Sequence, residues 1–397
     1  MSMVKISLCM IVKDEEESIE RCLNSVKGVV DEIIIVDTGS TDKTVELCQN
    51  YQSNIVKYTW NGSFADARNF GIQKATGDWI LWLDADEELD LSDQSFLKER
   101  KNFNKYDVIN LRLINYYGKC IDEDNTTEIA HTRLFRNKGI RFINNMHERL
   151  DLTNISKDRI GFLPVKVYHY GYLDSTIQKK KKPERNMGML MRQIEEGENI
   201  YWAHYFIALE YYNKKQYSEA LEHVNLSILS FLENGVLPQS MVYKLKYSIL
   251  IAMGKFKEAL LGIEKALKLY PDYVDLVYLK GVILYYLKKY EDAIQCFKDC
   301  IEMGEENKHY LILKGVGSFL AWNYISRCHQ KLKNAEEAIV SIMRSLLLSP
   351  SHKDSQNLLS SLLNNERHVP KLLKKHFNGK ERLKLEEILT TVEKKNG

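Results

Sequence analysis

Three short apolar runs near the start of the chain constrain the fold most. They are VKISLCMIV at 4–12, DEIIIVD at 31–37 and DWILWL at 78–83. Strands that are apolar on both faces are typical of parallel sheets covered by helices on each side. The connecting segments have helical spacing or capping residues at 15–26, 43–51 and 64–75, with another strand near 54–59. This alternation predicts a doubly wound α/β sheet, whose ligands bind beyond the carboxyl ends of its strands. Further strands are expected at 107–114, 132–136 and 162–170.

The second half of the chain carries an internal helical repeat. The segments YSEAL, FKEAL, YEDAI and AEEAI align four alanines, at 220, 259, 293 and 338. The spacing of 34 residues between the second and third alanines, with glycine, phenylalanine and prolines at matching offsets, resembles tetratricopeptide repeats. Each such repeat buries its apolar face only by stacking on a neighbour, so we expect an all-α solenoid whose concave face binds peptide. The domain boundaries follow: a catalytic domain over 1–175, a basic linker over 176–200, repeats over 201–360 and a charged helical tail over 361–397.

Composition narrows the class of protein. No apolar run approaches the roughly 20 residues that span a bilayer, and acids at Asp14–Glu17 stand where a signal peptide would stay apolar. Seven cysteines without a CxxC pair indicate reduced thiols, and Cys296 and Cys300 are expected to be structural. We therefore expect a soluble cytoplasmic protein. The acidic first half suits a bound cation and the basic second half an acidic partner, although a lysine-rich solvated surface explains the latter equally well.

The stretch DWILWLDADEELD, residues 78–90, places five carboxylates at the end of a buried strand. They repel one another unless something positive lies among them. Asp84 and Asp86, separated by one residue, lie on the same side of an extended chain. Such oxygen ligands suit Mg²⁺ or Mn²⁺, which keeps open positions for phosphate oxygens. A solvated acidic loop is the alternative, but the position at a strand end favours a divalent ion as the missing charge.

The segments ISLCMIVKDEE, IIIVDTGSTDKT and FADARNFGIQKATGDWILWLDADEE, in this order, resemble the family 2 glycosyltransferases with the GT-A fold. The resemblance implies that Asp37 contacts the nucleotide base and that Asp84 lies by the ribose. It implies that Asp86 coordinates the metal bridging the two phosphates of a UDP-sugar. It also implies that Arg68 lies near the base and phosphates and Glu15 on the nucleotide side. No GxGxxG motif follows the first strand and no P-loop motif occurs, which disfavours a dinucleotide-binding or P-loop protein. No nucleic-acid partner is expected.

Two histidine segments are further candidates, and similar ones occur in relatives that fuse this catalytic domain to tetratricopeptide repeats. IRFINNMHERL contains His147 and Glu148, and VKVYHYGY contains His169. An inverting transferase needs a base for the acceptor's proton, and Glu148 is our candidate. Alternatively, the His-Glu pair only orients a loop, and Asp86, Glu87 or an acceptor-bound water takes the proton. Many family members carry two acids here instead. His169 is expected to be a further metal ligand or diphosphate contact, with a core histidine as the alternative.

The lysine run that begins at Lys179 follows the His169 segment closely. Lys182 and Arg185 are expected to fold over the diphosphate as a lid, adding charge-assisted contacts and excluding water. The alternative is the solvated start of a helix.

The function implied by this layout is transfer of a hexose, glucose by default, from a UDP-sugar to a polypeptide. The architecture resembles the sublancin-type peptide S-glycosyltransferases, which implies a Cys or Ser of a bacteriocin precursor as acceptor. Two alternatives stay open. One is an enzyme that builds lipid-linked or cell-wall glycan, and the other is a scaffold with a decayed site that only binds nucleotide sugar. A homodimer is also expected, since tetratricopeptide faces often dimerise.

Overall fold

The computed structural model describes residues 4–179, 182–363 and 369–394. Within them the chain divides into two units. The first runs to Asn199 apart from Glu123–Asn125, and the second holds that tripeptide and everything from Ile200. The basic segment expected to be a linker forms α5 (Asp174–Lys179) and α6 (Lys182–Glu195), which belong to the first unit.

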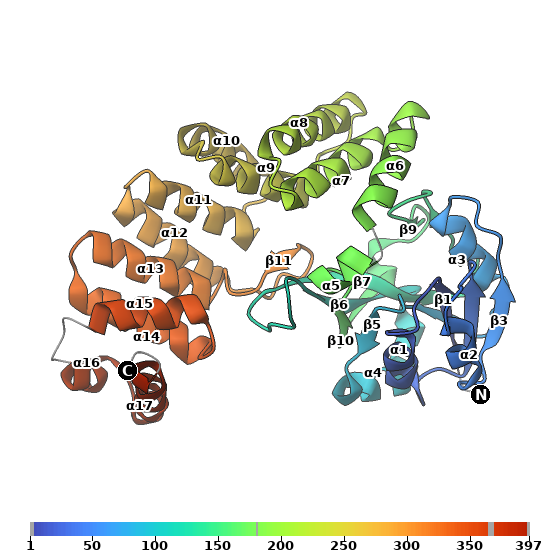
Figure 1. The fold of residues 1–397 in the computed structure, drawn as a ribbon, viewed down its shortest axis with the longest axis horizontal. Coiled ribbons are helices and arrows are strands. Elements are labelled where there is room, and N and C mark those ends of the chain that lie inside the picture. The colour runs from blue at the N-terminus through green and yellow to red at the C-terminus, as the bar shows by residue number, and fades with distance from the viewer. Residues whose placement is uncertain (1–3, 180–181, 364–368, 395–397) are drawn as a thin grey trace. The chain divides into compact units, whose positions relative to one another are not determined.

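The first unit is built on one mixed sheet (Figure 1). Its strand order is β3 (Asn54–Lys57), β2 (Glu32–Asp37), β1 (Ile6–Val12), β4 (Trp79–Trp82), β7 (Thr126–Arg136), β6 (Val108–Tyr116), β10 (Ile160–His169) and β5 (Glu87–Leu89). The strands β1 to β4 pair in parallel, as predicted. β7 then pairs antiparallel with both β4 and β6, and it is longer than expected. β5, which was not expected, pairs antiparallel with β10.

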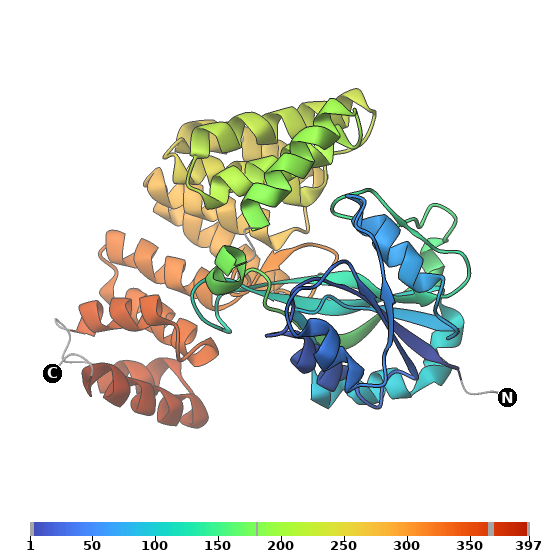
Figure 2. The ribbon, with the colours of Figure 1, turned by 45° about the vertical axis from the view of Figure 1, so that its right-hand side comes forward.

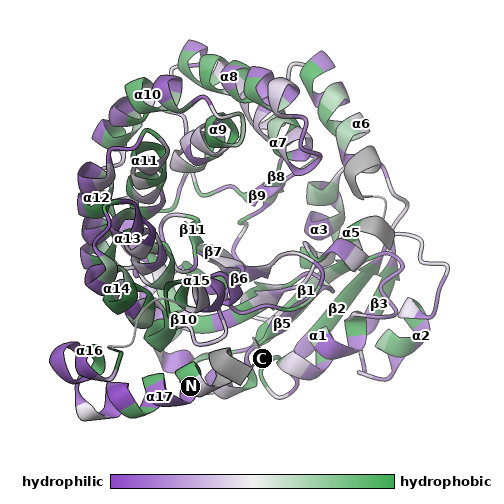
Figure 3. Ribbon diagram, turned by 60° about the vertical axis from the view of Figure 1, so that its left-hand side comes forward, coloured by the Kyte–Doolittle hydropathy of each residue, from purple (hydrophilic) through white to green (hydrophobic). Residues whose placement is uncertain are grey.

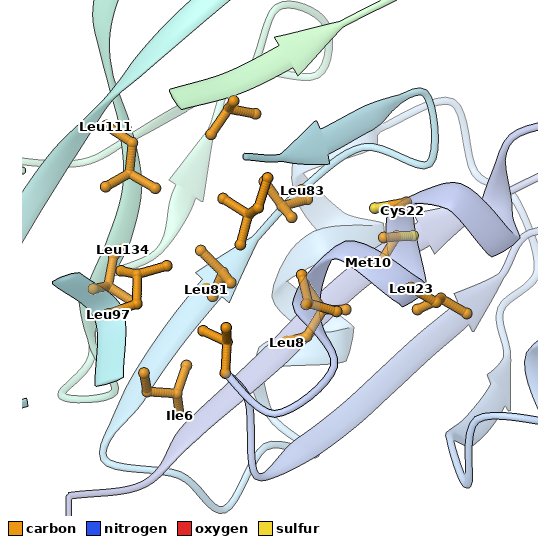
Figure 4. Close-up of a cluster of buried hydrophobic side chains, with 14 of the residues drawn as sticks. Ile6, Leu8, Met10, Cys22, Leu23, Leu81, Leu83, Leu97, Leu111 and Leu134 are labelled. Atoms are coloured by element: carbon orange, nitrogen blue, oxygen red, sulfur yellow. The ribbon is translucent and has the colours of Figure 1, made fainter. Parts of the chain in front are cut away.

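Helices cover both faces of the parallel strands. They are α1 (Ile19–Val26), α2 (Thr44–Gln49), α3 (Phe64–Ile72) and α4 (Gln94–Lys98), with short 3₁₀ turns at Leu91–Asp93, Arg100–Lys105 and Lys157–Arg159. Leu8 and Met10 of β1 pack with Leu23 of α1 (Figure 4), whereas Cys9 joins a second cluster with Ala65 of α3. Because successive strand residues point to opposite faces, both faces are buried, and β1 and β2 are largely hydrophobic in Figure 3.

A small hairpin lies on the α3 side of the sheet. It consists of β8 (Phe142–Ile143) and β9 (Arg149–Leu150), and its loop contains His147 and Glu148. Phe142 and Leu150 pack into the cluster that includes Cys9, while the backbone N–H of Phe64 donates to the carbonyl of Asn145 at 2.9 Å. The hairpin loop is therefore fastened to the start of α3.

The second unit is a run of stacked helices (Figures 1 and 2). They are α7 (Ile200–Asn213), α8 (Tyr217–Glu233), α9 (Ser240–Ala252), α10 (Phe256–Leu269), α11 (Val274–Tyr286), α12 (Tyr290–Met303), α13 (Phe319–Lys331), α14 (Ala335–Leu348) and α15 (Lys353–Leu363), with a two-residue strand, β11 (Ile312–Leu313). The four aligned alanines lie on α8, α10, α12 and α14, and each is fully buried. A Cβ at Gly281 of α11 would lie 2.7 Å from the ring of Phe297 of α12, so α11 and α12 meet at a small residue. The predicted helical repeat is confirmed.

The last helices, α16 (Val369–His376) and α17 (Gly379–Lys394), lie in the segment that the sequence predicted as a charged helical tail. Leu373, Phe377 and Leu385 are buried in a cluster with Ile342 and Leu346 of α14. The numerous charges of this segment therefore accompany an apolar face that extends the core of the second unit.

Two sequence expectations concern the whole chain. Among the described helices, none is long and apolar enough to cross a membrane. All seven cysteines lie in described segments and are free thiols. Burial raises the pKa of the Cys296 thiol to about 11, which disfavours the thiolate form that a metal would need and agrees with a structural role.

Candidate active site

Acidic side chains meet at one edge of the sheet. Asp37 ends β2, and Asp84 and Asp86 follow directly after β4. Because β1 pairs in parallel with both strands, these carboxyl ends lie on neighbouring positions of the same edge. Asp37 is nearly buried, and its Oδ1 accepts a hydrogen bond of 2.9 Å from the backbone N–H of Ser40, which fixes the loop after β2.

Four of the five carboxylates in this stretch pair with cationic side chains of the chain itself. The pairs are Asp84 with Arg68 at 2.6 Å, Glu87 with Arg133, Glu88 with Arg21 at 3.8 Å and Asp90 with Lys166 at 2.7 Å. The chain itself therefore supplies positive charge that the sequence led us to expect from a divalent ion. A bound cation is considered next at Asp86 and His169.

Asp86 faces an imidazole. Its Oδ1 lies 3.6 Å from Nε2 of His169, the last residue of β10. The other ring nitrogen, Nδ1, lies 2.8 Å from Oδ1 of Asn115, whose amide nitrogen donates to Thr127 at 3.3 Å. This orientation makes Asn115 an acceptor, so the imidazole carries its proton on Nδ1 when neutral and directs the Nε2 lone pair toward Asp86. Two electron-rich atoms facing each other at this distance suit a shared cation.

Gly171 leaves the room that such a cation needs. A Cβ at this position would lie 2.8 Å from Oδ2 of Asp86 and closer still to Nε2 of His169. Within the described segments, no group of three or more His, Cys, Asp or Glu side chains gathers into a complete metal cage. A carboxylate with one imidazole fits Mg²⁺ or Mn²⁺, which commonly completes its ligand set with waters and substrate phosphates.

Arg68 connects the strand end to the hairpin loop. Its Nη2 donates to Asp84 and its Nε to Glu148, both at 2.6 Å, and its guanidinium lies 4.5 Å from the centre of the Trp82 ring. Only 6% of the side chain is exposed. Burial alone would lower the pKa of Arg68, but the two carboxylates raise it, and Arg68 in turn lowers the pKa of Asp84 despite its burial. Arg68 thus orients Asp84 and Glu148, a role that the sequence did not suggest.

His147 and Glu148 sit in the loop of the hairpin. His147 adopts a left-handed backbone conformation, with φ of 50°. His147 is exposed, whereas the side chain of Glu148 is only 11% exposed. The two residues therefore differ: one is an exposed loop residue, and the other is a carboxylate held by Arg68.

The remaining candidate residues are less informative. Oε2 of Glu15 accepts from the hydroxyl of Ser18 at 2.7 Å, and its backbone N–H donates to Thr44 at 2.7 Å. Glu15 thus connects the loop after β1 with the start of α2. Lys182 and Arg185 lie on α6, but their side chains are outside the described part of the chain, as are residues 180 and 181 of the lysine run, so the lid stays a prediction.

Sequence reasoning missed three residues that shape the site, namely Arg133, Asn115 and Gly171. Arg133 directly precedes the buried apolar pair Leu134 and Phe135 of β7, and Asn115 stands near the end of the largely apolar β6. A polar side chain inside a buried strand usually has a specific partner, so both positions carried a signal. Nothing in the sequence shows which partner either residue has.

Comparison with known proteins agrees with this geometry. Residues 7–156 match the model of glycosyl transferase family 2, and residues 274–307 match that of the tetratricopeptide repeat. The chain is 26% identical over 378 residues to the SPbeta prophage-derived glycosyltransferase SunS of Bacillus subtilis, a match that covers 92% of this chain and 86% of that protein.

Two other relatives match mainly one half of the chain. A TPR repeat-containing protein of Synechococcus elongatus is 36% identical over 195 residues, which cover 46% of each chain. An uncharacterized glycosyltransferase of Rickettsia bellii is 32% identical over 187 residues, which cover 42% of this chain and 60% of that protein. Both matches span less than two thirds of the relative's own length. The two family models, together with the mixed α/β sheet and the stacked helices, confirm the predicted fold class. The chain carries a family 2 glycosyltransferase domain followed by a tetratricopeptide-repeat region.

Proposed function

We propose that this protein transfers a hexose, with glucose as the first candidate, from a UDP-sugar to a polypeptide acceptor in a metal-dependent, inverting reaction. The observation that carries the proposal is the approach of Asp86 and His169, at 3.6 Å, on the ligand-binding edge of a family 2 glycosyltransferase domain. This is where such a fold receives its ligands.

The donor's parts are assigned along that edge. We assign the nucleotide base to Asp37, with Glu15 in the adjoining loop, and the ribose to Asp84. Asp86 and His169 would hold Mg²⁺ or Mn²⁺ against the diphosphate. When bound, this ion supplies positive charge for the phosphate oxygens of the leaving nucleotide. Arg68 supports these contacts indirectly, because it fixes the carboxylate of Asp84.

The acceptor's proton is assigned to Glu148. Its Oε1 is engaged by Arg68, so Oε2 is the oxygen that we assign to the proton. As the acceptor's sulfur or oxygen bonds to the anomeric carbon, its proton passes to Glu148 and the nucleoside diphosphate leaves from the opposite face. Glu87 is a poorer candidate, because it is 1% exposed and pairs with the buried Arg133. His147 orients the loop in this scheme.

A polypeptide acceptor is supported by the second unit. Tetratricopeptide helices form surfaces that bind peptides, and the similarity to SunS extends over both units. A Cys or Ser of a bacteriocin precursor is the first acceptor to test. We place the reaction in the cytoplasm, in line with seven unpaired thiols. A lid formed by Lys182 and Arg185, and a homodimer, stay predictions.

One experiment separates the proposal from its alternatives. Purified protein is incubated with Mn²⁺, UDP-[¹⁴C]glucose and either a cysteine-containing precursor peptide or a membrane lipid extract, with the Asp86→Asn variant as control. Label and a hexose mass shift on the peptide, absent in the variant, support the proposal. Label in the lipid fraction would instead support glycan synthesis. Absence of UDP release from any common sugar nucleotide would favour a scaffold.

A further inference from the structure

The side chain of Glu87 closes the acidic turn, which we define as residues 84–87. Its Oε2 accepts from the backbone N–H of Asp84 at 3.1 Å, and its own N–H donates to the carbonyl of Asp84 at 3.0 Å. The carbonyl of Asp86 accepts from the N–H of Tyr170 at 3.0 Å. The segment that presents Asp84 and Asp86 is thus fixed at both ends by hydrogen bonds.

Arg133 of β7 holds Glu87 from behind. Its Nη2 donates to Oε1 of Glu87, and the two side chains are only 4% and 1% exposed. The guanidinium also lies 3.9 Å from the centre of the ring of Trp82, the last residue of β4. A carboxylate removed from water needs a counter-charge and hydrogen bonds, and Arg133 supplies both.

We propose that Arg133 and Glu87 form a positioning pair that sets the geometry of the acidic turn before the donor binds. Neither side chain touches the substrate in this role. They act through the main chain of Asp84 and Asp86. The consequence for catalysis rests on the proposed function, whereas the order imposed on the turn does not.

The pair acts on the turn through atoms of this chain alone. By fixing the main chain of Asp84 and Asp86 in advance, it leaves little ordering to be done when the nucleotide binds. Removing the pair should therefore loosen the turn and weaken nucleotide binding together.

The test uses full-length variants. Glu87→Leu combined with Arg133→Met removes the pair without leaving a buried charge. Arg133→Lys keeps the charge and serves as the conservative variant. The matched control is Glu128→Leu with Arg112→Met, which removes another Arg–Glu pair, of 2.7 Å, between β6 and β7. Melting temperatures and circular dichroism identify the variants that fold.

Two measurements decide the outcome. Hydrogen exchange in the ligand-free protein, read on a peptide covering residues 79–90, should be faster in the double variant than in wild type. The affinity of the double variant for UDP in the presence of Mn²⁺ should fall about 10- to 100-fold. This is the usual effect of losing a residue that orients a metal ligand. The control pair should change neither, and Arg133→Lys should recover most of the affinity.

Unchanged exchange in the turn of a folded double variant would overturn the proposal, as would a UDP affinity within about twofold of wild type. If the double variant does not fold, Glu87→Gln, which loses the ion pair but keeps the shape of the side chain, decides: faster exchange in the turn with weaker UDP binding supports the proposal, and no change in either overturns it. A wild-type protein that binds no UDP would count against the proposed function alone, because the exchange measurement needs no ligand.

Discussion

Nε2 of His169 lies 3.6 Å from Oδ1 of Asp86, although 83 positions separate the two residues in the chain. The approach follows from the pairing of β5 with β10, which sets His169 opposite Glu87. A carboxylate in the turn after β4 and an imidazole at the end of β10 are thereby brought together by strand pairing.

The first prediction concerns Asn115, which holds the opposite side of the His169 ring. Asn115→Leu should weaken Mn²⁺ binding in the presence of UDP about 10- to 100-fold, because the imidazole loses the acceptor that fixes its proton and orientation. Titration of Mn²⁺ by electron paramagnetic resonance measures this. Asn110→Leu is the control, since its oxygen accepts from Thr132 on the same pair of strands. Equal Mn²⁺ affinity in both variants would remove His169 from the metal site.

A second prediction concerns the space at Gly171. Gly171→Ala should lower the UDP-sugar turnover of a protein that still folds, because the new methyl group would press on Asp86 and His169. Turnover at saturating Mn²⁺ measures the loss of activity, and the melting temperature shows whether the variant is also less stable. Gly188→Ala on α6 is the control, since no atom lies within 4 Å of its Cβ position and alanine favours a helix. Full turnover in Gly171→Ala would show that the space is not used.

The third prediction is a pH dependence that arises at His131 of β7. Burial and the neighbouring Arg133 lower its pKa from 6.5 to about 3, so between these values the unfolded chain binds a proton that the folded chain does not. The free energy of unfolding of the first unit should therefore fall as the pH drops from 6.5 to 3, by about 1.4 kcal/mol per pH unit for this group.

His131→Leu should remove that contribution, because leucine does not titrate. Hydrogen exchange of peptides from β1 and β4 across this pH range gives the slope for the first unit alone. An unaltered slope in the variant would mean that His131 titrates normally.

Much of the first unit could be predicted because its strands are apolar on both faces. β1, β2 and β4 stand out in the sequence for this reason, and the helices between them follow from spacing and caps. β5 could not be found, because its residues Glu87–Leu89 are acidic and read as part of a loop. The start of β7 was missed for a similar reason, since its first residues are polar and buried by pairing rather than by hydrophobicity.

The candidate site, like the fold, could be predicted only in part. The positions of Asp37, Asp84 and Asp86 at strand ends follow from the local sequence pattern alone. The arginines that balance this acidic stretch cannot be predicted in this way, because they come from elsewhere in the chain: Arg68, which pairs with Asp84, from α3, and Arg133, which pairs with Glu87, from β7. Strand order and register decide which arginine meets which carboxylate, and neither can be read from spacing. A cluster of acids therefore indicated a bound cation where the protein itself supplies most of the charge.

The last prediction tests that internal charge at Arg68. Arg68→Met removes the counter-charge of Glu148, whose side chain is 11% exposed, and of Asp84, whose side chain is 35% exposed. This should cost about 1–3 kcal/mol of unfolding free energy, less than for a fully buried pair because water reaches Asp84. Arg68 lowers the pKa of Asp84, so its contribution is complete above pH 3.8, the ordinary pKa of the carboxyl, and is lost as the pH falls below it. The difference between variant and wild type should therefore shrink in acid.

The control for this comparison is Arg159→Met. Arg159 also pairs with one carboxylate through two hydrogen bonds of 2.9 Å, to Asp107, but 37% of its side chain is exposed. Its loss should cost much less than the loss of Arg68, because water replaces the partner. Hydrogen exchange on the strands of the first unit measures both variants. Equal costs for the two would mean that the carboxylates of Asp84 and Glu148 are balanced by something other than Arg68, and a bound cation would again be required to explain the acidic cluster.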